Sequence, residues 1–230
     1  KADVYVNDVL IGSHQGGYTP FSLNVTPFLN GLKNQKLVVR VWDPSDKGFQ
    51  PRGKQVANPE GIWYTPVTGI WQTVWLEPVS INHVTAIKAI PDIDNSVINV
   101  TVTTSDKECL DVVEVNILDK GALLASAKGI QGKEFRLDVK NPKLWSPSSP
   151  YLYDMEVSIL KNGKKVDNVK SYTAFRKISY KKDSNGIMRM YLNNEPLFQY
   201  GPLDQGWWPD GLYTAPTDEA LLYDIKKTKE

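Results

Sequence analysis

The sequence Asn141-Pro142-Lys143-Leu144-Trp145-Ser146-Pro147, followed by Pro150-Tyr151-Leu152-Tyr153, places the first strong constraint on the fold. Proline fixes φ and lacks a backbone N–H, so this stretch cannot lie inside a regular helix or a central strand. We interpret it as a rigid, extended entry into a strand over residues 152–160. Its counterpart earlier in the chain is Gly69-Ile70-Trp71-Gln72-Thr73-Val74-Trp75-Leu76-Glu77, in which we expect another short strand.

Short β-branched or aromatic runs, many bounded by turn residues, predict strands over most of the chain before residue 200. The expected strands are residues 4–6, 37–42, 74–76, 97–102, 112–118, 135–139, 155–160 and 171–175. Asn162-Gly163 predicts a tight hairpin, because both residues tolerate the positive φ that such a turn needs. Strands at this spacing, without helices between them, indicate antiparallel β-sandwiches.

The pattern changes near the C-terminus. Residues 197–200 are predicted to form a strand and residues 201–216 a loop. A helix is expected from Thr217, because Asp218 and Glu219 complement its positive end and lysines complement the other. We interpret this part as the first βα unit of a larger domain, and therefore expect the chain to be a fragment.

Composition excludes several functional classes. The 230 residues suffice for two domains, and the formal net charge of +1 gives no electrostatic case for nucleic acid or an acidic membrane. Cys109 is the only cysteine, so neither an internal disulfide nor a zinc site around it is expected. His14 and His83 stand apart from any nucleophile or metal motif, and no phosphate-binding glycine loop is present. We therefore expect no cofactor and no metal.

The compartment is left open by the sequence. No apolar run approaches the roughly 20 residues that span a bilayer, and no signal peptide is recognisable. The chain opens directly on a strand-like segment without an initiating methionine. We expect the natural N-terminus to be missing, and a periplasmic or secreted bacterial protein fits the low cysteine usage.

Asp43 is the first candidate binding residue. It ends a hydrophobic strand and opens the irregular segment 43–68, whose length and aromatic content are typical of functional loops. A carboxylate there could accept hydrogen bonds from sugar hydroxyls while neighbouring rings cover the sugar. However, Asp43 precedes Pro44, and an Asp–Pro pair usually initiates a turn. From the residues alone the turn role is favoured.

The second candidate is the loop Asp204-Gln205-Gly206-Trp207-Trp208-Pro209-Asp210-Gly211. Two tryptophans in a polar, glycine-flanked loop are difficult to explain as core residues. If the preceding strand begins a parallel barrel, this loop lies on the catalytic face. The equal alternative is a lid or interface loop that packs on the preceding sandwich. No pair of carboxylates stands out as an acid/base and a nucleophile.

Taken together and in order, several motifs resemble the non-catalytic modules of glycoside hydrolase family 2, which includes β-galactosidases, β-glucuronidases and β-mannosidases. They are Gly16-Gly17-Tyr18-Thr19-Pro20-Phe21, Gly69 to Glu77, Leu144-Trp145-Ser146-Pro147 and Tyr191-Leu192-Asn193-Asn194-Glu195-Pro196-Leu197-Phe198. The resemblance implies a mostly β chain: a partial jelly-roll sugar-binding domain over residues 1–80, an immunoglobulin-like β-sandwich over 81–180 and the start of a TIM barrel over 181–230.

The same resemblance implies a non-catalytic portion of a retaining, β-galactosidase-like enzyme from a bacterium. The catalytic glutamates are expected beyond residue 230, so this chain should be inactive and should contain no catalytic residue. Asp43, Asp204, Trp207, Trp208 and Asp210 are expected to contact the carbohydrate substrate, and for Asp43 the resemblance outweighs the turn role. The loop at 203–210 departs from the Asn-Arg-His-Glu-His-His type of some β-galactosidases, which puts a lactase-like specificity in doubt. The alternatives are a stand-alone carbohydrate-binding module and a structural or adhesive β-sandwich protein.

Overall fold

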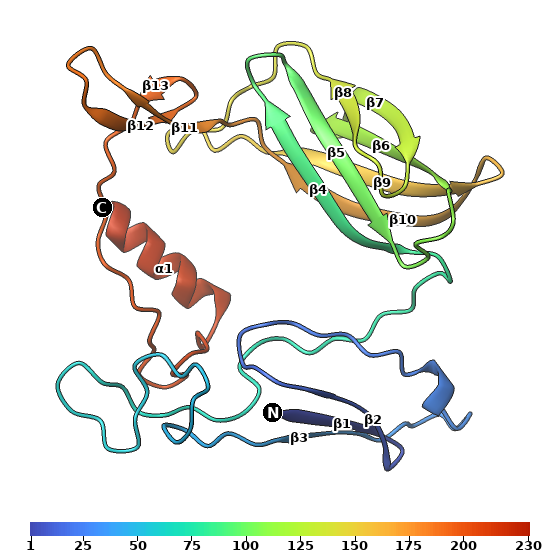
Figure 1. Ribbon diagram of the computed structural model, residues 1–230, viewed down its shortest axis with the longest axis vertical. Coiled ribbons are helices and arrows are strands. Elements are labelled where there is room, and N and C mark those ends of the chain that lie inside the picture. The colour runs from blue at the N-terminus through green and yellow to red at the C-terminus, as the bar shows by residue number, and fades with distance from the viewer. The chain divides into compact units, whose positions relative to one another are not determined.

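The computed structural model describes all 230 residues, which form two compact units (Figure 1). The first unit combines Lys1–Trp75 with Pro202–Glu230, and the second is continuous from Leu76 to Gly201. Segments from both ends of the chain therefore pack within one unit. Neither helical segment combines the length and apolarity needed to cross a lipid bilayer.

The second unit is dominated by seven antiparallel strands in two sheets. One sheet has the order β4-β5-β8 and the other the order β10-β9-β6-β7. The strands are β4 (Val84–Asp92), β5 (Val97–Thr104), β6 (Val112–Asp119), β7 (Ala122–Ile130), β8 (Phe135–Asp138), β9 (Tyr153–Lys161) and β10 (Lys164–Thr173). The helix-free, mostly β organisation predicted for this region is confirmed.

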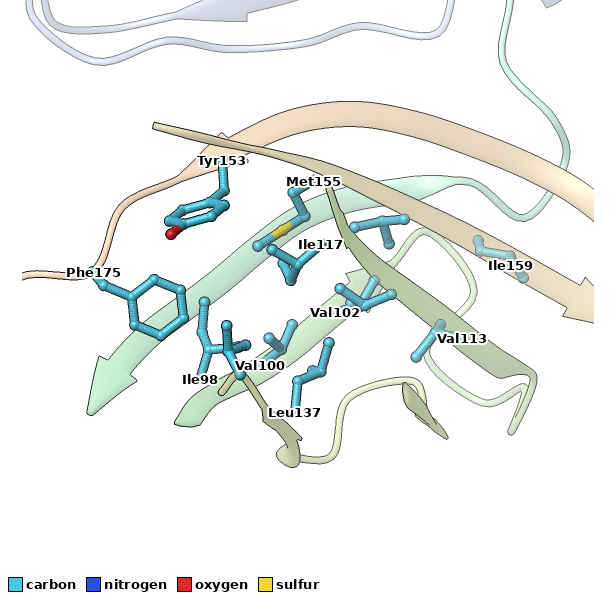
Figure 2. Packing of buried hydrophobic residues seen from close by; sticks show 13 residues of the cluster. Ile98, Val100, Val102, Val113, Ile117, Leu137, Tyr153, Met155, Ile159 and Phe175 are labelled. Carbon is cyan, nitrogen blue, oxygen red and sulfur yellow. The ribbon is translucent and has the colours of Figure 1, made fainter. Parts of the chain in front are cut away.

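Both sheets contribute to one apolar core (Figure 2). On β5 the side chains of Ile98, Val100 and Val102 are completely buried, while the residues between them are partly exposed. The two-residue period places alternate side chains on the inner face. Facing them from the other sheet lie Ile117 of β6 and Met155 of β9. Each such side chain contributes roughly 1.5–3 kcal/mol by leaving water.

The proline-rich entry to β9 is fixed to the end of the sandwich. The Trp145 backbone N–H donates to the Phe175 carbonyl at 2.8 Å, and the Lys143 backbone N–H donates to the Tyr153 hydroxyl at 2.7 Å. The Arg176 guanidinium lies 4.7 Å from the centre of the Trp145 ring. Trp145 is nevertheless only half-buried, because Phe175, not Trp145, fills the core at this end.

A small third sheet follows the sandwich in the same unit. It contains β11 (Ile178–Lys182), β12 (Met188–Leu192) and β13 (Glu195–Pro196) in that order. The predicted strand over residues 197–200 is absent, which corrects the expected βα unit: only its helix is formed. Only Leu197 continues the pairing, through its backbone N–H to the Met190 carbonyl of β12 at 3.0 Å, whereas residues 198–200 find no strand partner for their backbone hydrogen bonds.

The first unit contains one three-stranded antiparallel sheet with the order β2-β1-β3. Its elements are β1 (Ala2–Val6), β2 (Val9–His14), the 3-10 helix η1 (Thr26–Phe28), β3 (Leu37–Val41) and α1 (Asp218–Lys229). Only Val4 and Val6 of the sheet are buried. The strand expected at 74–76 is absent, because that segment finds no pairing partner in the chain.

Helix α1 confirms the sequence prediction closely. Its N-cap is Thr217, whose hydroxyl accepts a hydrogen bond from the Ala220 backbone N–H at 3.2 Å. Acidic residues occupy the first turn and lysines the last, as the helix dipole favours. No residue of α1 is buried, so capping and charge rather than packing define its bounds within this unit.

Candidate functional site

The irregular segment 43–68 of the first unit is ordered by hydrogen bonds to its own side chains. The Asp43 carboxylate accepts from the Ser45 backbone N–H at 2.8 Å and from the Thr68 hydroxyl at 3.0 Å, which joins the two ends of the segment. Asp46 accepts from the Ala57 backbone N–H at 2.9 Å. Asp43 therefore forms the turn that its Asp–Pro context predicts, and it also closes the loop.

Gln55 is the buried centre of this segment, with 7% of its surface exposed. Its amide oxygen accepts from the Val67 backbone N–H at 2.7 Å. Its amide nitrogen donates to the Arg52 carbonyl and to the Tyr213 hydroxyl, each at 3.0 Å. Because a buried polar group must find partners, Gln55 fixes the segment internally and also ties it to the C-terminal loop.

Trp207 contacts the same segment through its ring. It stacks on Tyr64, with ring centres 4.7 Å apart and planes inclined by 18°, and it meets Tyr213 edge-to-face at 5.2 Å. The Tyr64 hydroxyl donates to the Gln205 amide oxygen. These are the favoured geometries of aromatic pairs. Residues separated widely in sequence thus form one aromatic cluster within the first unit.

A cavity of about 280 Å³ opens beside this cluster. Its walls are Lys54, Tyr64, Leu203, Gln205, Trp207 and Tyr213. Trp207, Tyr64 and Tyr213 are each half-buried, so parts of their rings remain accessible. Accessible rings next to a few polar groups are the arrangement expected of a small-molecule site.

The aromatic cluster extends from Tyr213 to Trp71 and Tyr18. Trp71 lies 5.6 Å from Tyr213 and 6.2 Å from Tyr18, centre to centre, and its indole N–H donates to the Gly17 carbonyl at 2.8 Å. Burial raises the pKa of the Tyr18 phenol, and the hydrogen bond with Tyr213 and the nearby charge of Asp43 add to this effect. Tyr18, Trp71 and Tyr213 thus form a row of aromatic side chains that ends at Trp207, whereas Asp43 makes its hydrogen bonds to Ser45 and Thr68 and does not line the cavity.

The remaining predicted site residues lie in the turns of the C-terminal loop. The Asp204 carboxylate accepts from the Gly206 backbone N–H at 2.8 Å, and Asp210 accepts from the Gly211 N–H at 2.9 Å. Both carboxylates are exposed. The backbones of Trp208 and Leu212 exchange two hydrogen bonds that close the turn. Asp204 and Asp210 shape the loop, whereas Trp207 lines the cavity directly.

Sequence reasoning missed Gln55, Lys54, Tyr64 and Tyr213. Tyr64 carried a signal, because it was one of the aromatic residues in an unusually long loop. Gln55 and Tyr213 carried none, since their importance comes from a hydrogen bond across 158 positions. No cluster of three or more His, Cys, Asp or Glu side chains suited to a metal ion occurs in the chain.

The chain is similar to several known proteins. The family "Glycosyl hydrolases family 2" matches residues 82–176, which are the sandwich of the second unit. The resemblance inferred from the sequence motifs is thereby confirmed over this segment.

Individual relatives extend the match beyond the sandwich. A β-galactosidase of Thermoanaerobacter pseudethanolicus is 28% identical over 97% of this chain and 31% of its own length. A β-glucuronidase of Formosa agariphila is 25% identical over 87% of the chain and 22% of its own length. The chain thus spans less than a third of the length of either relative.

Solved structures show the same fold. The β-glucuronidase of Ruminococcus gnavus in complex with C6-substituted uronic isofagomine has a TM-score of 0.81 at 21% identity, covering 99% of this chain and 39% of that one. A β-glycosidase from Bacteroides vulgatus has a TM-score of 0.76 at 22% identity, with 99% and 28% covered.

Proposed function

We propose that the chain is the non-catalytic portion of a retaining β-glycosidase that acts on β-galactosides or β-glucuronides. The observation that carries this proposal is the cavity lined by Trp207, Tyr64 and Tyr213 in a chain whose matched relatives are named for those two activities. Aromatic rings cover the apolar face of a sugar, and polar side chains beside them bind its hydroxyls. The chain contributes substrate binding rather than bond cleavage.

In this proposal residues 1–80 are a partial jelly roll, residues 81–180 an immunoglobulin-like spacer and residues 181–230 the entrance to a (β/α)8 barrel. The seven-stranded sandwich and the helix α1 support the last two assignments. The three-stranded sheet β2-β1-β3 supports the first. The acid/base and nucleophile carboxylates, which in retaining enzymes lie about 5–5.5 Å apart, are assigned to later barrel strands.

Trp207 is assigned the ring contact with the sugar. Asp43 is assigned a hydroxyl contact on the strength of the family resemblance, and its charge reaches the aromatic cluster at Tyr18, whose pKa it helps to raise. The rim of the site is assigned to the residues that hold or flank that loop, which are Trp208, Asp204 and Asp210.

Sugar binding by the 230-residue chain tests the proposal. Addition of methyl β-galactoside or methyl β-glucuronide should perturb tryptophan fluorescence saturably in the wild type, and Trp207→Ala should abolish the effect. Trp75→Ala is the matched control, because Trp75 is 70% exposed and outside the cavity wall. Aryl β-galactosides and β-glucuronides should not be hydrolysed. Absence of binding to both sugars, or turnover by pure protein, would contradict the proposal.

A longer form of the enzyme that includes the barrel tests Asp43. Asp43→Ala should lower kcat/KM by 10-fold or more, which corresponds to about 1.4 kcal/mol. Asp43→Asn separates the two roles, since its amide oxygen can still accept from Ser45 while the negative charge is lost. Unchanged kinetics in both variants would leave Asp43 as a turn residue.

A further inference from the structure

Tyr213 is the residue at which several parts of the first unit meet. Its hydroxyl accepts a hydrogen bond from the Gln55 amide at 3.0 Å and shares another with the Tyr18 phenol. Its ring lies 5.6 Å from the Trp71 ring, centre to centre, with the two planes inclined by 52°. The hydroxyl and the ring of Tyr213 are therefore held by different partners, which come from different parts of the chain.

The surroundings of Tyr213 leave its side chain little freedom. A Cβ at Gly53, whose φ is +61°, would lie 3.3 Å from the Tyr213 hydroxyl, so the backbone of the 43–68 segment passes directly beside that group. The next residue, Thr214, donates from its hydroxyl to the Trp71 carbonyl at 2.9 Å, which fixes the backbone that carries the tyrosine. Because its hydroxyl already has two protein partners, Tyr213 is suited to holding the site rather than to binding a ligand through that group.

Trp207 depends on Tyr213 for the second of its two ring contacts. Tyr64 stacks on Trp207, and Tyr213 meets it edge-to-face with ring centres 5.2 Å apart and planes inclined by 76°. A stacked contact alone allows two rings to slide and rotate over one another, because many offset arrangements are favourable. A second ring that contacts Trp207 at a steep angle removes this freedom.

We propose that Tyr213 is a positioning residue that sets the orientation of the Trp207 ring at the sugar-binding cavity. The inference rests on the proposed function, because Trp207 is the residue that is assigned the ring contact with the sugar. The Tyr213 hydroxyl anchors its own ring, and that ring in turn restricts Trp207. A sugar then meets a ring that is already oriented, which avoids the entropic cost of ordering it during binding.

Fluorine NMR of the 230-residue chain, labelled with fluorinated tryptophan, tests the orientation without any sugar. The Trp207 resonance is identified by its loss in Trp207→Phe, and in the wild type it should be single and narrow. Tyr213→Leu removes the ring and should broaden or split this resonance, because several orientations of Trp207 become populated. A displacement alone is not diagnostic, since loss of a neighbouring ring changes the shielding of the fluorine. Tyr213→Phe keeps the ring and should keep the resonance single and narrow.

Two further variants control for folding. Tyr223→Leu is the matched control, because Tyr223 is 60% exposed on α1, and it should leave the Trp207 resonance unchanged. If Tyr213→Leu unfolds the first unit, the resonances of all its tryptophans will collapse together. Tyr213→Met then replaces Tyr213→Leu, since the flexible methionine side chain fills more of the vacated volume.

Sugar affinity supplies the functional measurement. The probe is methyl β-galactoside or methyl β-glucuronide, whichever the wild type binds more tightly. Tyr213→Leu should weaken its binding about 10-fold, which is the upper range of what one aromatic pair contributes. Tyr213→Phe should retain most of the affinity. A purely structural role would lower the urea midpoint of the first unit and leave both the Trp207 line width and the affinity of the folded protein unchanged.

The outcomes separate this inference from the proposed function. A Trp207 resonance that stays single and narrow in folded Tyr213→Leu, or one that Tyr213→Phe broadens equally, overturns the inference. Wild-type sugar affinity in a Tyr213→Leu variant whose Trp207 resonance is broadened also overturns it. Failure of the wild type to bind either sugar overturns the sugar-binding cavity instead, and the fluorine spectra still decide whether Tyr213 orients Trp207.

Discussion

Replacing Gln55 by methionine should selectively destabilise the first unit. Methionine approximates the length and volume of glutamine but cannot form its three hydrogen bonds. The change leaves the backbone N–H of Val67 without an acceptor and removes the amide that donates to Tyr213. The C-terminal loop that carries Trp207 would then lose its hydrogen bond to the 43–68 segment.

The expected loss in unfolding free energy is about 2 kcal/mol. A buried donor left unsatisfied costs about 1–3 kcal/mol, and each ordinary hydrogen bond contributes about 0.5–1.5 kcal/mol net. The carbonyl of Arg52 retains a second donor, the backbone N–H of Gln55, so its cost is small. With a urea m-value of about 1.5 kcal/mol/M, the midpoint of unfolding should fall by about 1.3 M.

Tryptophan fluorescence can report the first unit by itself. Six of the seven tryptophans lie there, and Trp145 is the only one in the second unit, so a Trp145→Phe background isolates the signal. Gln131→Met is the matched control, because Gln131 is also buried but lies in the sandwich unit. It should lower the stability of the second unit and leave this signal unchanged.

The reasoning is refuted if Gln55→Met leaves the urea midpoint of the fluorescence transition within about 0.3 M of the parent, a shift well below the cost of an unsatisfied buried donor. It is also refuted if Gln131→Met shifts that transition as much as Gln55→Met does. Either result would mean that the hydrogen bonds of Gln55 do not hold the 43–68 segment to the C-terminal loop.

Two further predictions concern a turn and a carboxylate. Gly211→Ala should disrupt the C-terminal loop and weaken sugar binding at least 10-fold, because an added Cβ would lie 1.8 Å from the Thr214 carbonyl oxygen. In the sandwich, hydrogen bonds from Tyr151 and then Lys143 hold the pKa of Asp119 below its usual range. The ionised Asp119 carboxylate therefore stabilises the sandwich fully at pH values above the ordinary carboxyl pKa of about 3.9. This stabilisation is lost as pH falls through the lowered pKa of Asp119 in the folded state. Asp119→Asn should reduce the loss of stability as pH falls below the ordinary carboxyl pKa.

Each of these two predictions has a control variant. Gly201→Ala, where an added Cβ meets no atom within 4 Å, should leave sugar binding unchanged. Asp138→Asn, a change at a carboxylate that pairs with Arg136 on the same sandwich, should keep the acid sensitivity that Asp119 provides. Sugar binding that survives Gly211→Ala, or an acid transition that Asp119→Asn leaves unaltered, would contradict the respective prediction.

Local sequence patterns predicted those elements whose cause is local. The β-branched runs over residues 97–102 and 155–160 predicted the strands β5 and β9, whose apolar side chains form much of the sandwich core. Asn162-Gly163 adopts the positive φ values that its residue types allow. Strand β7 was missed, because Ala122–Ile130 is rich in alanine and is a strand through its pairing with β6 rather than through propensity.

The sequence by itself determined which residues alternate, where the chain turns and where α1 begins, since each depends on a few neighbouring residues. Only the tertiary structure decided that residues 74–76 and 198–200 remain unpaired, because a strand exists only where another backbone supplies its hydrogen bonds. The tertiary structure also determines that the Gln55 amide donates to the Tyr213 hydroxyl and that Tyr64 stacks on Trp207. Such contacts depend on how the long stretch of chain between the two residues folds. A pattern of a few neighbouring residues does not contain that information.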